Sequence, residues 1–294
     1  MPAQPPFGRL LSAMVTPFDA DGALDLDGAA ALASYLVDEL GHDGLVVSGT
    51  TGESPTTTNA EKTALLAAVI AAVGDRAAVI AGVGSFDTRH TVQTAQEAAA
   101  AGADGILVVT PYYSKPPQSG LVQHFSTVAD STELPVMLYD IPHRAGIPIA
   151  TDTMLRLAEH PRIVAVKDAK GDLAASSKVI AETDLAYYSG EDALTLPLLS
   201  VGAVGVVGTS THFSGCETKQ MIEAYLAGDV STALRLHQQL LPIFTGIFAT
   251  QGCILVKAGL ELQGRGVGGL RLPLVNATEA EKQALARCLA AAGL

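Results

Sequence analysis

Short apolar runs recur along the chain, and each is four to seven residues long. Uninterrupted runs of this length, rich in β-branched residues, are typical of parallel strands that are buried on both faces. The pattern therefore predicts eight such strands. They begin near Leu10, Leu45, Val79, Ile106, Val136, Ile163, Ala186 and Val204.

Alanine-rich segments with helical spacing lie between these runs, for example over 60–73 and 88–101. Strand, loop and helix repeated about eight times predict an α/β fold, a (β/α)₈ TIM barrel. A doubly wound open sheet is the competing interpretation. It would usually show a glycine-rich phosphate turn after the first strand, where this chain reads VTPF at 15–18.

The pattern changes after Thr211, where only helical periodicity remains. We expect a barrel catalytic domain over 1–230 and a small all-helical C-terminal domain over 231–294. No low-complexity linker separates the two, so the second should pack on the first. The GRGVGG stretch at 264–269 is expected to be a flexible loop and not a phosphate-binding loop, because no strand precedes it and no Lys-Ser/Thr follows.

The composition of the chain argues against several classes of function. Of 294 residues, 48% are hydrophobic, which allows a sizeable core, while a net charge of −12 and 5% aromatics argue against a nucleic-acid partner. The longest apolar stretch, 64–73, is about half a membrane span, and the N-terminus has no signal-peptide pattern, so we expect a cytoplasmic protein without a membrane partner. Three cysteines without a CxxC pair, and no HExxH, indicate neither a metal site nor a cofactor.

Lys167 is the strongest candidate for chemistry. Reactive side chains in a barrel lie at the carboxyl ends of strands, and Lys167-Asp168 follows the predicted sixth strand directly. Partial desolvation would lower the pKa of the amine, and a free amine attacks a carbonyl to form an imine that can act as an electron sink. Pairing of Lys167 with Asp168 or another acid is the alternative, and position alone leaves both open.

Three further strand ends carry candidates. Tyr139 follows the fifth strand and could move a proton, and Arg144 in the next loop has the forked donor that suits a carboxylate. The turn SGTTGES at 48–54 has exposed N–H groups that could hold an anion, but it lacks the lysine of a nucleotide-binding loop. Each has a structural alternative: a rim aromatic, a solvated loop arginine and an ordinary strand–helix turn.

The remaining polar candidates are weaker. Adjacent Tyr112 and Tyr113 are more typical of packing or of an interface than of catalysis, whereas His143 and His212 are expected in loops at the top of the barrel. The other histidines are expected on the surface or on helices. They are His42, His90, His124, His160 and His237.

Four stretches together closely resemble the dihydrodipicolinate synthase / N-acetylneuraminate lyase family, and most of all its actinobacterial dihydrodipicolinate synthases. The resemblance runs from about Leu10 to Leu274. The stretches are GTTGESPT at 49–56, VVTPYYSKP at 108–116, LYDIPHRAGIPI at 138–149 and VAVKDAKGD at 164–172.

The resemblance implies a barrel with a C-terminal helical domain in a homotetramer. It implies that Lys167 forms an imine with pyruvate and that Tyr139 shuttles a proton, linked to Thr51 and to Tyr113 of a neighbouring subunit. Thr50 and Thr51 would hold the pyruvate carboxylate. Arg144 would bind the carboxylate of L-aspartate 4-semialdehyde, and the Val207 carbonyl would complete the pocket. The reaction implied belongs to lysine and diaminopimelate biosynthesis.

Arg144 in its IPxR context, the Thr50-Thr51 pair and the double tyrosine favour the synthases over sugar-acid aldolases or lyases of the same family, which remain the alternative. A non-catalytic relative would be expected to lack one of the key side chains. Two departures lie near the pocket: Gly208 after the eighth strand, and His143 where Ser or Gly is usual. Asn59 and Lys62 stand in the helix where lysine-inhibited members carry histidines, which predicts weak or no inhibition by lysine.

Overall fold

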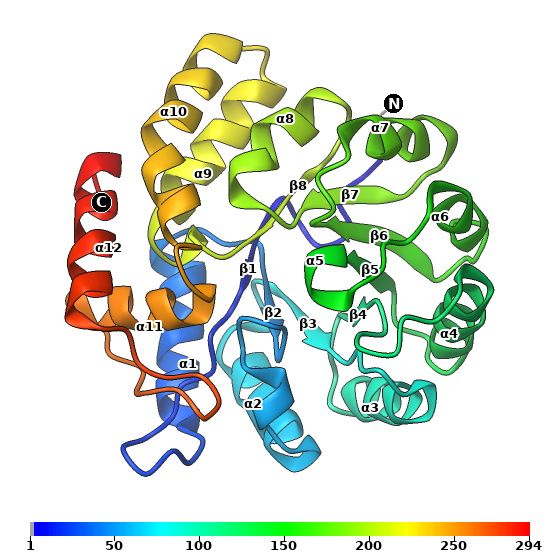
Figure 1. Cartoon of the computed structure of the whole chain (residues 1–294), viewed down its shortest axis with the longest axis horizontal. Coiled ribbons are helices and arrows are strands. Elements are labelled where there is room, and N and C mark those ends of the chain that lie inside the picture. The colour runs from blue at the N-terminus through cyan, green and yellow to red at the C-terminus, as the bar shows by residue number, and fades with distance from the viewer. Residues whose placement is uncertain (1–2) are drawn as a thin grey trace.

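The computed structural model describes residues 3–294, and its centre is a closed barrel of eight parallel strands in the order β1 to β8. Figure 1 shows the strands surrounded by a ring of helices. This confirms the predicted barrel and excludes the open sheet. The strands are β1 Leu10–Ala13, β2 Gly44–Val47, β3 Ala78–Gly82, β4 Gly105–Val109, β5 Val136–Asp140, β6 Ile163–Asp168, β7 Ala186–Ser189 and β8 Gly205–Gly208.

Helices connect successive strands on the outside of the barrel. Several begin with a side-chain cap; at α2, for example, Thr58 and Glu61 form a reciprocal capping box. The connecting elements are α1 Leu26–Ser34, η1 Tyr35–Glu39, η2 Ser54–Thr56, α2 Asn59–Val73, α3 Thr88–Ala100, α4 Gln118–Asp130, α5 Pro142–Ala145, α6 Thr151–Leu157, α7 Leu173–Glu182, η3 Asp192–Leu194, α8 Thr195–Ser200 and α9 Thr211–Leu226.

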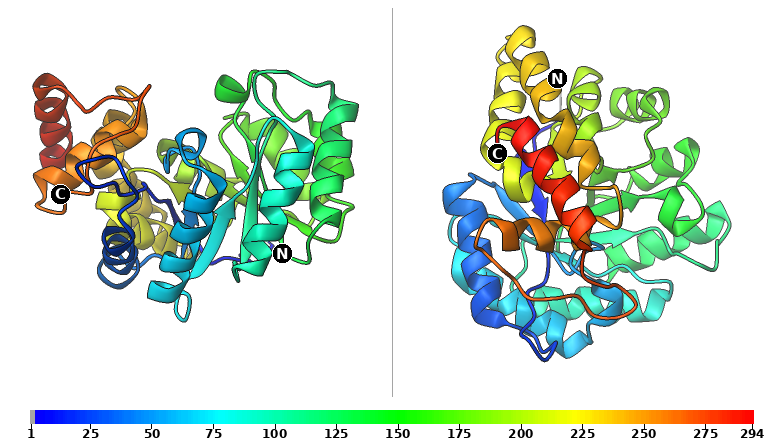
Figure 2. Two further views of the ribbon diagram at one scale, coloured as in Figure 1. Left: turned by 90° about the horizontal axis from the view of Figure 1, so that it is seen from below. Right: turned by 60° about the vertical axis from the view of Figure 1, so that its left-hand side comes forward.

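Three helices follow the barrel: α10 Val230–Gly246, α11 Gly252–Leu262 and α12 Glu279–Ala292. α10 packs on α9 and α12, and α11 packs on α12. Figure 2 shows α11 and α12 on the flank of the barrel that carries α1. No helix within residues 3–294 is long and apolar enough to cross a membrane. The domain boundary at residue 230 stays a prediction.

Alternation of side chains along each strand divides the core into two layers. Alternate residues such as Leu11, Val46 and Met137 fill the inside of the barrel, whereas their neighbours, such as Leu45 and Leu138, pack against the helices. Both sets are fully buried, which explains why the strands read as uninterrupted apolar runs. A side chain two residues beyond an inward-facing one therefore also points inward, at the carboxyl end of its strand.

Candidate active site

Lys167 and Tyr139 lie side by side at the carboxyl end of the barrel. They are register partners in the β5–β6 pair, and each follows an inward-facing residue, Ala165 and Met137, by two positions. The Lys167 Nζ lies 4.4 Å from the centroid of the Tyr139 ring. The strand register thus brings together the two side chains that the sequence placed at neighbouring strand ends.

Lys167 is buried, and within the described part of the chain no carboxylate oxygen lies within 4 Å of its amine. Asp168 is on the opposite face of β6, where its carboxylate accepts hydrogen bonds from Ser176 Oγ and from the Lys170 backbone N–H. The alternative that Lys167 pairs with Asp168 is therefore wrong, because successive strand residues point to opposite faces.

Burial controls the protonation of both groups. Desolvation lowers the pKa of Lys167 to about 8, although the carboxylates of Asp192 and Glu191 oppose the shift. Burial likewise raises the pKa of Tyr139 well above its usual value, and the nearby Arg144 guanidinium opposes that change. At neutral pH the site therefore holds a protonated phenol and an amine that loses its proton far more readily than an ordinary lysine.

A cavity of about 260 Å³ opens from Lys167 toward the solvent. Its wall is built by the ends of several strands and by the start of α11. The lining residues include Thr50, Thr51, Tyr139, Arg144, Lys167, Glu191, Thr209 and Gly252. The segment between α10 and the start of α11 thus closes one side of the cavity. An adjoining hollow shares Thr50, Tyr139 and Arg144 and extends over β3 and β4 to Tyr112.

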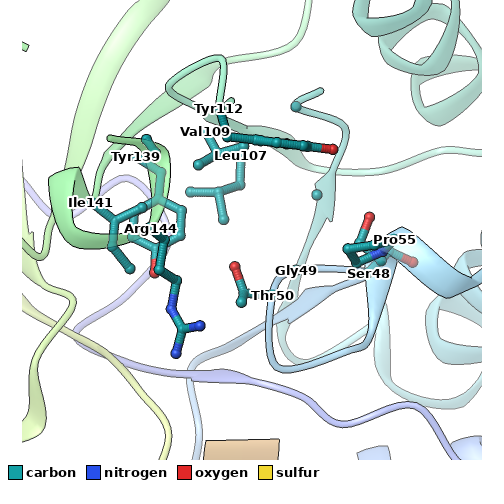
Figure 3. A pocket seen from close by; sticks show the side chains of 14 residues that line it. Ser48, Gly49, Thr50, Pro55, Leu107, Val109, Tyr112, Tyr139, Ile141 and Arg144 are labelled. Atoms are coloured by element: carbon teal, nitrogen blue, oxygen red, sulfur yellow. The ribbon is translucent and has the colours of Figure 1, made fainter. Parts of the chain in front are cut away.

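The turn after β2 forms another wall. Thr51 is buried and Thr50 is partly buried, and Figure 3 shows the Thr50 hydroxyl facing Tyr139 and Arg144 across the cavity. The turn is closed by backbone hydrogen bonds from Glu53 N–H to Thr50 O (3.2 Å) and from Ser54 N–H to Gly49 O (3.3 Å). Such a tight turn can present N–H groups and hydroxyls to a small anion.

Arg144 and His143 lie on the short helix α5 at the entrance of the cavity. Both are exposed, and both line the cavity. Gly146, with φ 84°, ends this helix, and its N–H donates to Pro142 O. The forked guanidinium of Arg144 can therefore meet a carboxylate that enters from solvent.

Two acids beside Lys167 were missed from the sequence. Glu191 lines the cavity, and Asp192 is fully buried, where it accepts hydrogen bonds from Thr209 N–H and from Ser210 Oγ (2.8 Å). Burial raises the pKa of both carboxyls. The strand-end rule could have found them, because they lie in the connection just after β7.

Asp192 also explains the departure at Gly208. A Cβ at residue 208 would lie 2.7 Å from Asp192 Oδ1 and 2.4 Å from Thr211 Cγ2. A side chain there would have to displace both groups, so the glycine allows the close approach of Asp192 to the end of β8.

The two remaining implied site residues lie in very different surroundings. The Val207 side chain belongs to the apolar layer inside the barrel, and Val207 pairs in register with Leu11. Tyr113 is 92% exposed, on a loop where its φ is 71°. Its neighbour Tyr112 packs edge-on against Phe86, with ring centroids 5.6 Å apart.

The histidines are mostly structural. His212 is fully buried under the barrel end, where its ring contacts Thr209 O and Ser12 Oγ. The expectation that His42 lies at the surface or on a helix is wrong: it is in a buried loop, where its Nδ1 lies 2.7 Å from Leu36 O and desolvation lowers its pKa to about 3. The expectation that His143 and His212 lie in loops is also wrong, because they belong to the first turns of α5 and α9; of the two, only His143 lines the cavity.

Comparison with known proteins matches nearly the whole chain. The family model described as the Dihydrodipicolinate synthetase family matches residues 6–292. A curated 4-hydroxy-tetrahydrodipicolinate synthase from Acidothermus cellulolyticus is 68% identical over 98% of this chain and 93% of its own length.

Solved structures agree with this match. The synthase from Cyanidioschyzon merolae with lysine bound superposes with a TM-score of 0.97 at 43% identity, covering 99% of this chain and 100% of that one. The chloride-inhibited dihydrodipicolinate synthase from Acinetobacter baumannii, complexed with pyruvate, gives a TM-score of 0.94 at 34% identity over 98% and 99% of the two chains.

Proposed function

The chain belongs to the dihydrodipicolinate synthetase family, and we propose that it forms the product for which its curated relatives are named, 4-hydroxy-tetrahydrodipicolinate. It is a Schiff-base-forming synthase of the class I aldolase type. The observation that carries the proposal is a buried lysine that has no carboxylate within 4 Å among residues 3–294 and is held against a buried tyrosine at the wall of a small cavity. Its place in metabolism is lysine and diaminopimelate biosynthesis.

The first substrate is pyruvate, which the A. baumannii relative binds. The neutral amine of Lys167 attacks the ketone carbon, water leaves and an imine forms. Thr50 and Thr51 hold the carboxylate through their N–H groups and hydroxyls. The protonated imine draws electrons from the methyl group, which loses a proton to give an enamine, and the Tyr139 hydroxyl relays this proton.

The second substrate is L-aspartate 4-semialdehyde, whose carboxylate Arg144 receives at the cavity entrance. The enamine carbon attacks the aldehyde, a carbon–carbon bond forms and the aldehyde oxygen takes up a proton. The amine of the semialdehyde then attacks the imine carbon, which closes the ring and breaks the bond to Lys167. The Val207 carbonyl at the end of β8 completes the pocket.

Tyr113 belongs to this proposal through a second subunit. Its exposure leaves the ring free to enter the site of a neighbour, where it would extend a proton relay to Tyr139. Thr50 takes the place expected for Thr51 in this relay, because its hydroxyl faces Tyr139. We expect a homotetramer in solution, and light scattering after gel filtration measures this. Its location in the cytoplasm also stays a prediction.

The decisive experiment is turnover of pyruvate with aspartate semialdehyde, coupled to NADPH oxidation by the reductase that consumes the product. Pyruvate-saturable turnover is expected. In parallel, pyruvate and borohydride should add the mass of the reduced adduct at Lys167. Trapping without turnover would keep the imine chemistry and refute the acceptor; no trapping would refute the proposed mechanism.

A further inference from the structure

A second buried lysine lies behind the turn that carries Thr50 and Thr51. Lys257 of α11 places its Nζ 2.8 Å from Glu53 Oε1, and the two side chains are 3% and 0% exposed. Lys257 also donates to Gly269 O (2.6 Å), while Glu53 Oε2 accepts the Arg271 backbone N–H (3.0 Å). A buried ion pair persists only where such additional hydrogen bonds satisfy both partners.

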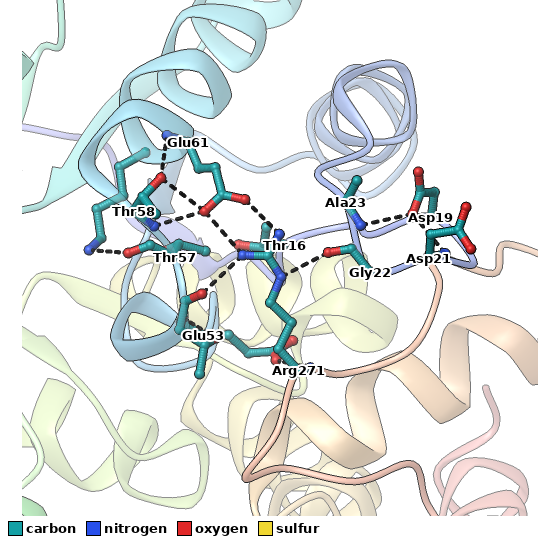
Figure 4. Close-up of polar contacts among 12 residues, drawn as sticks. Thr16, Asp19, Asp21, Gly22, Ala23, Glu53, Thr57, Thr58, Glu61 and Arg271 are labelled. Carbon is teal, nitrogen blue, oxygen red and sulfur yellow. Dashed lines mark hydrogen bonds and ion pairs between the residues drawn. The ribbon is translucent and has the colours of Figure 1, made fainter.

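Arg271 joins Glu53 to the surrounding loops, and Figure 4 shows Arg271 near Glu53, Glu61 and Gly22. Its guanidinium donates to Glu61 Oε1 (2.6 Å), to Thr56 O (2.9 Å) and to Gly22 O (2.9 Å). The Phe18 ring lies against both cations, with Lys257 Nζ 4.4 Å and Arg271 Cζ 4.2 Å from its centroid. Arg271 therefore connects three segments that are distant in sequence.

Glu53 determines how the turn closes. Its φ of 54° is left-handed, which is uncommon for a residue with a side chain and persists only where the surroundings enforce it. Its N–H donates to Thr50 O, and Thr16 Oγ1 donates to Gly52 O (2.6 Å). The position of the Glu53 carboxylate thus constrains the backbone that immediately follows Thr50 and Thr51.

The partners of Glu53 come from the C-terminal segment. α11 begins at Gly252, which lines the cavity, and one and a half turns later it supplies Lys257. The loop expected to be flexible is held in place: Val267 O accepts the Phe18 N–H, and Gly268, with φ 75°, approaches Phe18 so closely that a Cβ would lie 1.7 Å from its carbonyl oxygen.

We propose that Lys257 and Arg271 are positioning residues: through Glu53 they hold the Thr50–Thr51 turn in the shape that receives the substrate carboxylate. This rests on the proposed function for the identity of the anion, pyruvate. The C-terminal segment therefore does more than cover the barrel. It sets the geometry of the binding turn from behind, without touching the substrate.

The first test is amide hydrogen exchange, followed by mass spectrometry, in the full chain carrying Lys257→Met. Removing the cation leaves the Glu53 carboxylate buried without its partner, so the turn should relax. We expect peptides covering 48–57 to exchange at least about tenfold faster than in the wild type, at labelling times too short for global unfolding to expose strands β4 to β7. Lys282→Met is the matched control, because it removes an ion pair of equal length (2.8 Å, with Glu261) on α12, away from the turn.

The second test is a pyruvate titration with borohydride trapping, together with steady-state kinetics. Lys257→Met should raise the pyruvate concentration for half-maximal trapping about tenfold, and the KM for pyruvate alike, while the KM for the aldehyde stays within about twofold. A general loss of structure would instead lower the active fraction and leave both KM values unchanged. Glu53→Gln keeps the shape of residue 53, and it should give the same pattern in a milder form.

Unchanged exchange in the turn of a folded Lys257→Met protein, or a pyruvate half-saturation within twofold of the wild type, would overturn the proposal. If Lys257→Met does not fold, Glu53→Gln decides by the same two readouts. A wild-type protein that traps no pyruvate would refute the proposed function, whereas the exchange comparison would still decide the positioning role.

Discussion

Lys167 and Lys257 are equally buried, yet their surroundings give them opposite tasks. Each amine lies 4.4 Å from an aromatic centroid, and burial lowers the pKa of both. Lys257 has a carboxylate at 2.8 Å and a carbonyl at 2.6 Å, whereas Lys167 faces a cavity. A paired ammonium is fixed and unreactive, while one that lacks a contacting carboxylate can lose its proton and act as a nucleophile.

The largest effect that follows from this contrast is on activity. Lys167→Met should abolish borohydride trapping of pyruvate and lower turnover by more than about a thousandfold, because no amine remains to form the imine. The same variant should be as stable as the wild type or more stable by about 1–2 kcal/mol, since a desolvated amine without a carboxylate partner is replaced by an apolar chain. Activity assays and urea unfolding measure the two quantities. Retained turnover would contradict the role proposed for Lys167.

Lys257→Met should lower the stability of the protein, in contrast to Lys167→Met. Removing one partner of a buried ion pair destabilises a protein by about 3–5 kcal/mol. Thermal and urea unfolding should therefore show a clear loss for Lys257→Met beside none for Lys167→Met. Equal stability of the two variants would mean that the pairing of Lys257 does not distinguish it from Lys167.

The role proposed for Arg144 at the entrance of the cavity can be tested separately from that of Lys167. Arg144→Ala should raise the KM for aspartate semialdehyde by about 10–100-fold, because a charge-assisted hydrogen bond to its carboxylate is lost. Trapping of pyruvate by Lys167 should be retained, since Arg144 only lines the entrance. Steady-state kinetics with each substrate varied in turn measure this, and an equal rise in both KM values would contradict the assigned role.

The pH dependence of imine formation follows from the lowered pKa of Lys167. Only the neutral amine attacks, so the rate of pyruvate trapping should rise with pH, pass its midpoint near 8 and level off above it. Between pH 7 and pH 9 the rise should be about tenfold. Single-turnover trapping from pH 6 to pH 10 measures the curve. A midpoint near the ordinary lysine value of about 10.4 would show that the amine is not desolvated.

The smallest effect concerns a third, half-buried lysine. Lys62 on α2 donates to Thr57 O (3.1 Å), and nearby Asn59 accepts from the His90 ring (3.0 Å). The C. merolae relative has been solved with lysine bound. Because Asn59 and Lys62 stand where histidines are expected in lysine-inhibited members, about 1 mM lysine should lower turnover by less than twofold. Strong inhibition by submillimolar lysine would overturn this prediction.

Much of the fold was accessible from local patterns. Every predicted strand start lies within one residue of the observed strand. These predictions succeeded because short apolar runs and helical periodicity reflect burial residue by residue. The predicted place of Lys167 at a strand end held for the same reason, since strand alternation and barrel topology determine which way it points.

The sites that the sequence did not resolve depend on contacts between distant segments. Glu191 and Asp192 followed the strand-end rule but carried no motif, and their approach to Lys167 requires β6, β7 and β8 to be packed together. Glu53 was visible in the turn, but nothing local relates it to Lys257 or Arg271.

Local periodicity in the amino-acid sequence was enough to predict the eight strands and the barrel, and it placed Lys167, the lysine proposed to form the imine, at the end of one strand. Which of the two equally buried lysines contacts a carboxylate became clear only from the folded structure. Ion pairing depends on the distance between groups far apart in the chain, and that distance exists only once the barrel and the C-terminal helices have packed.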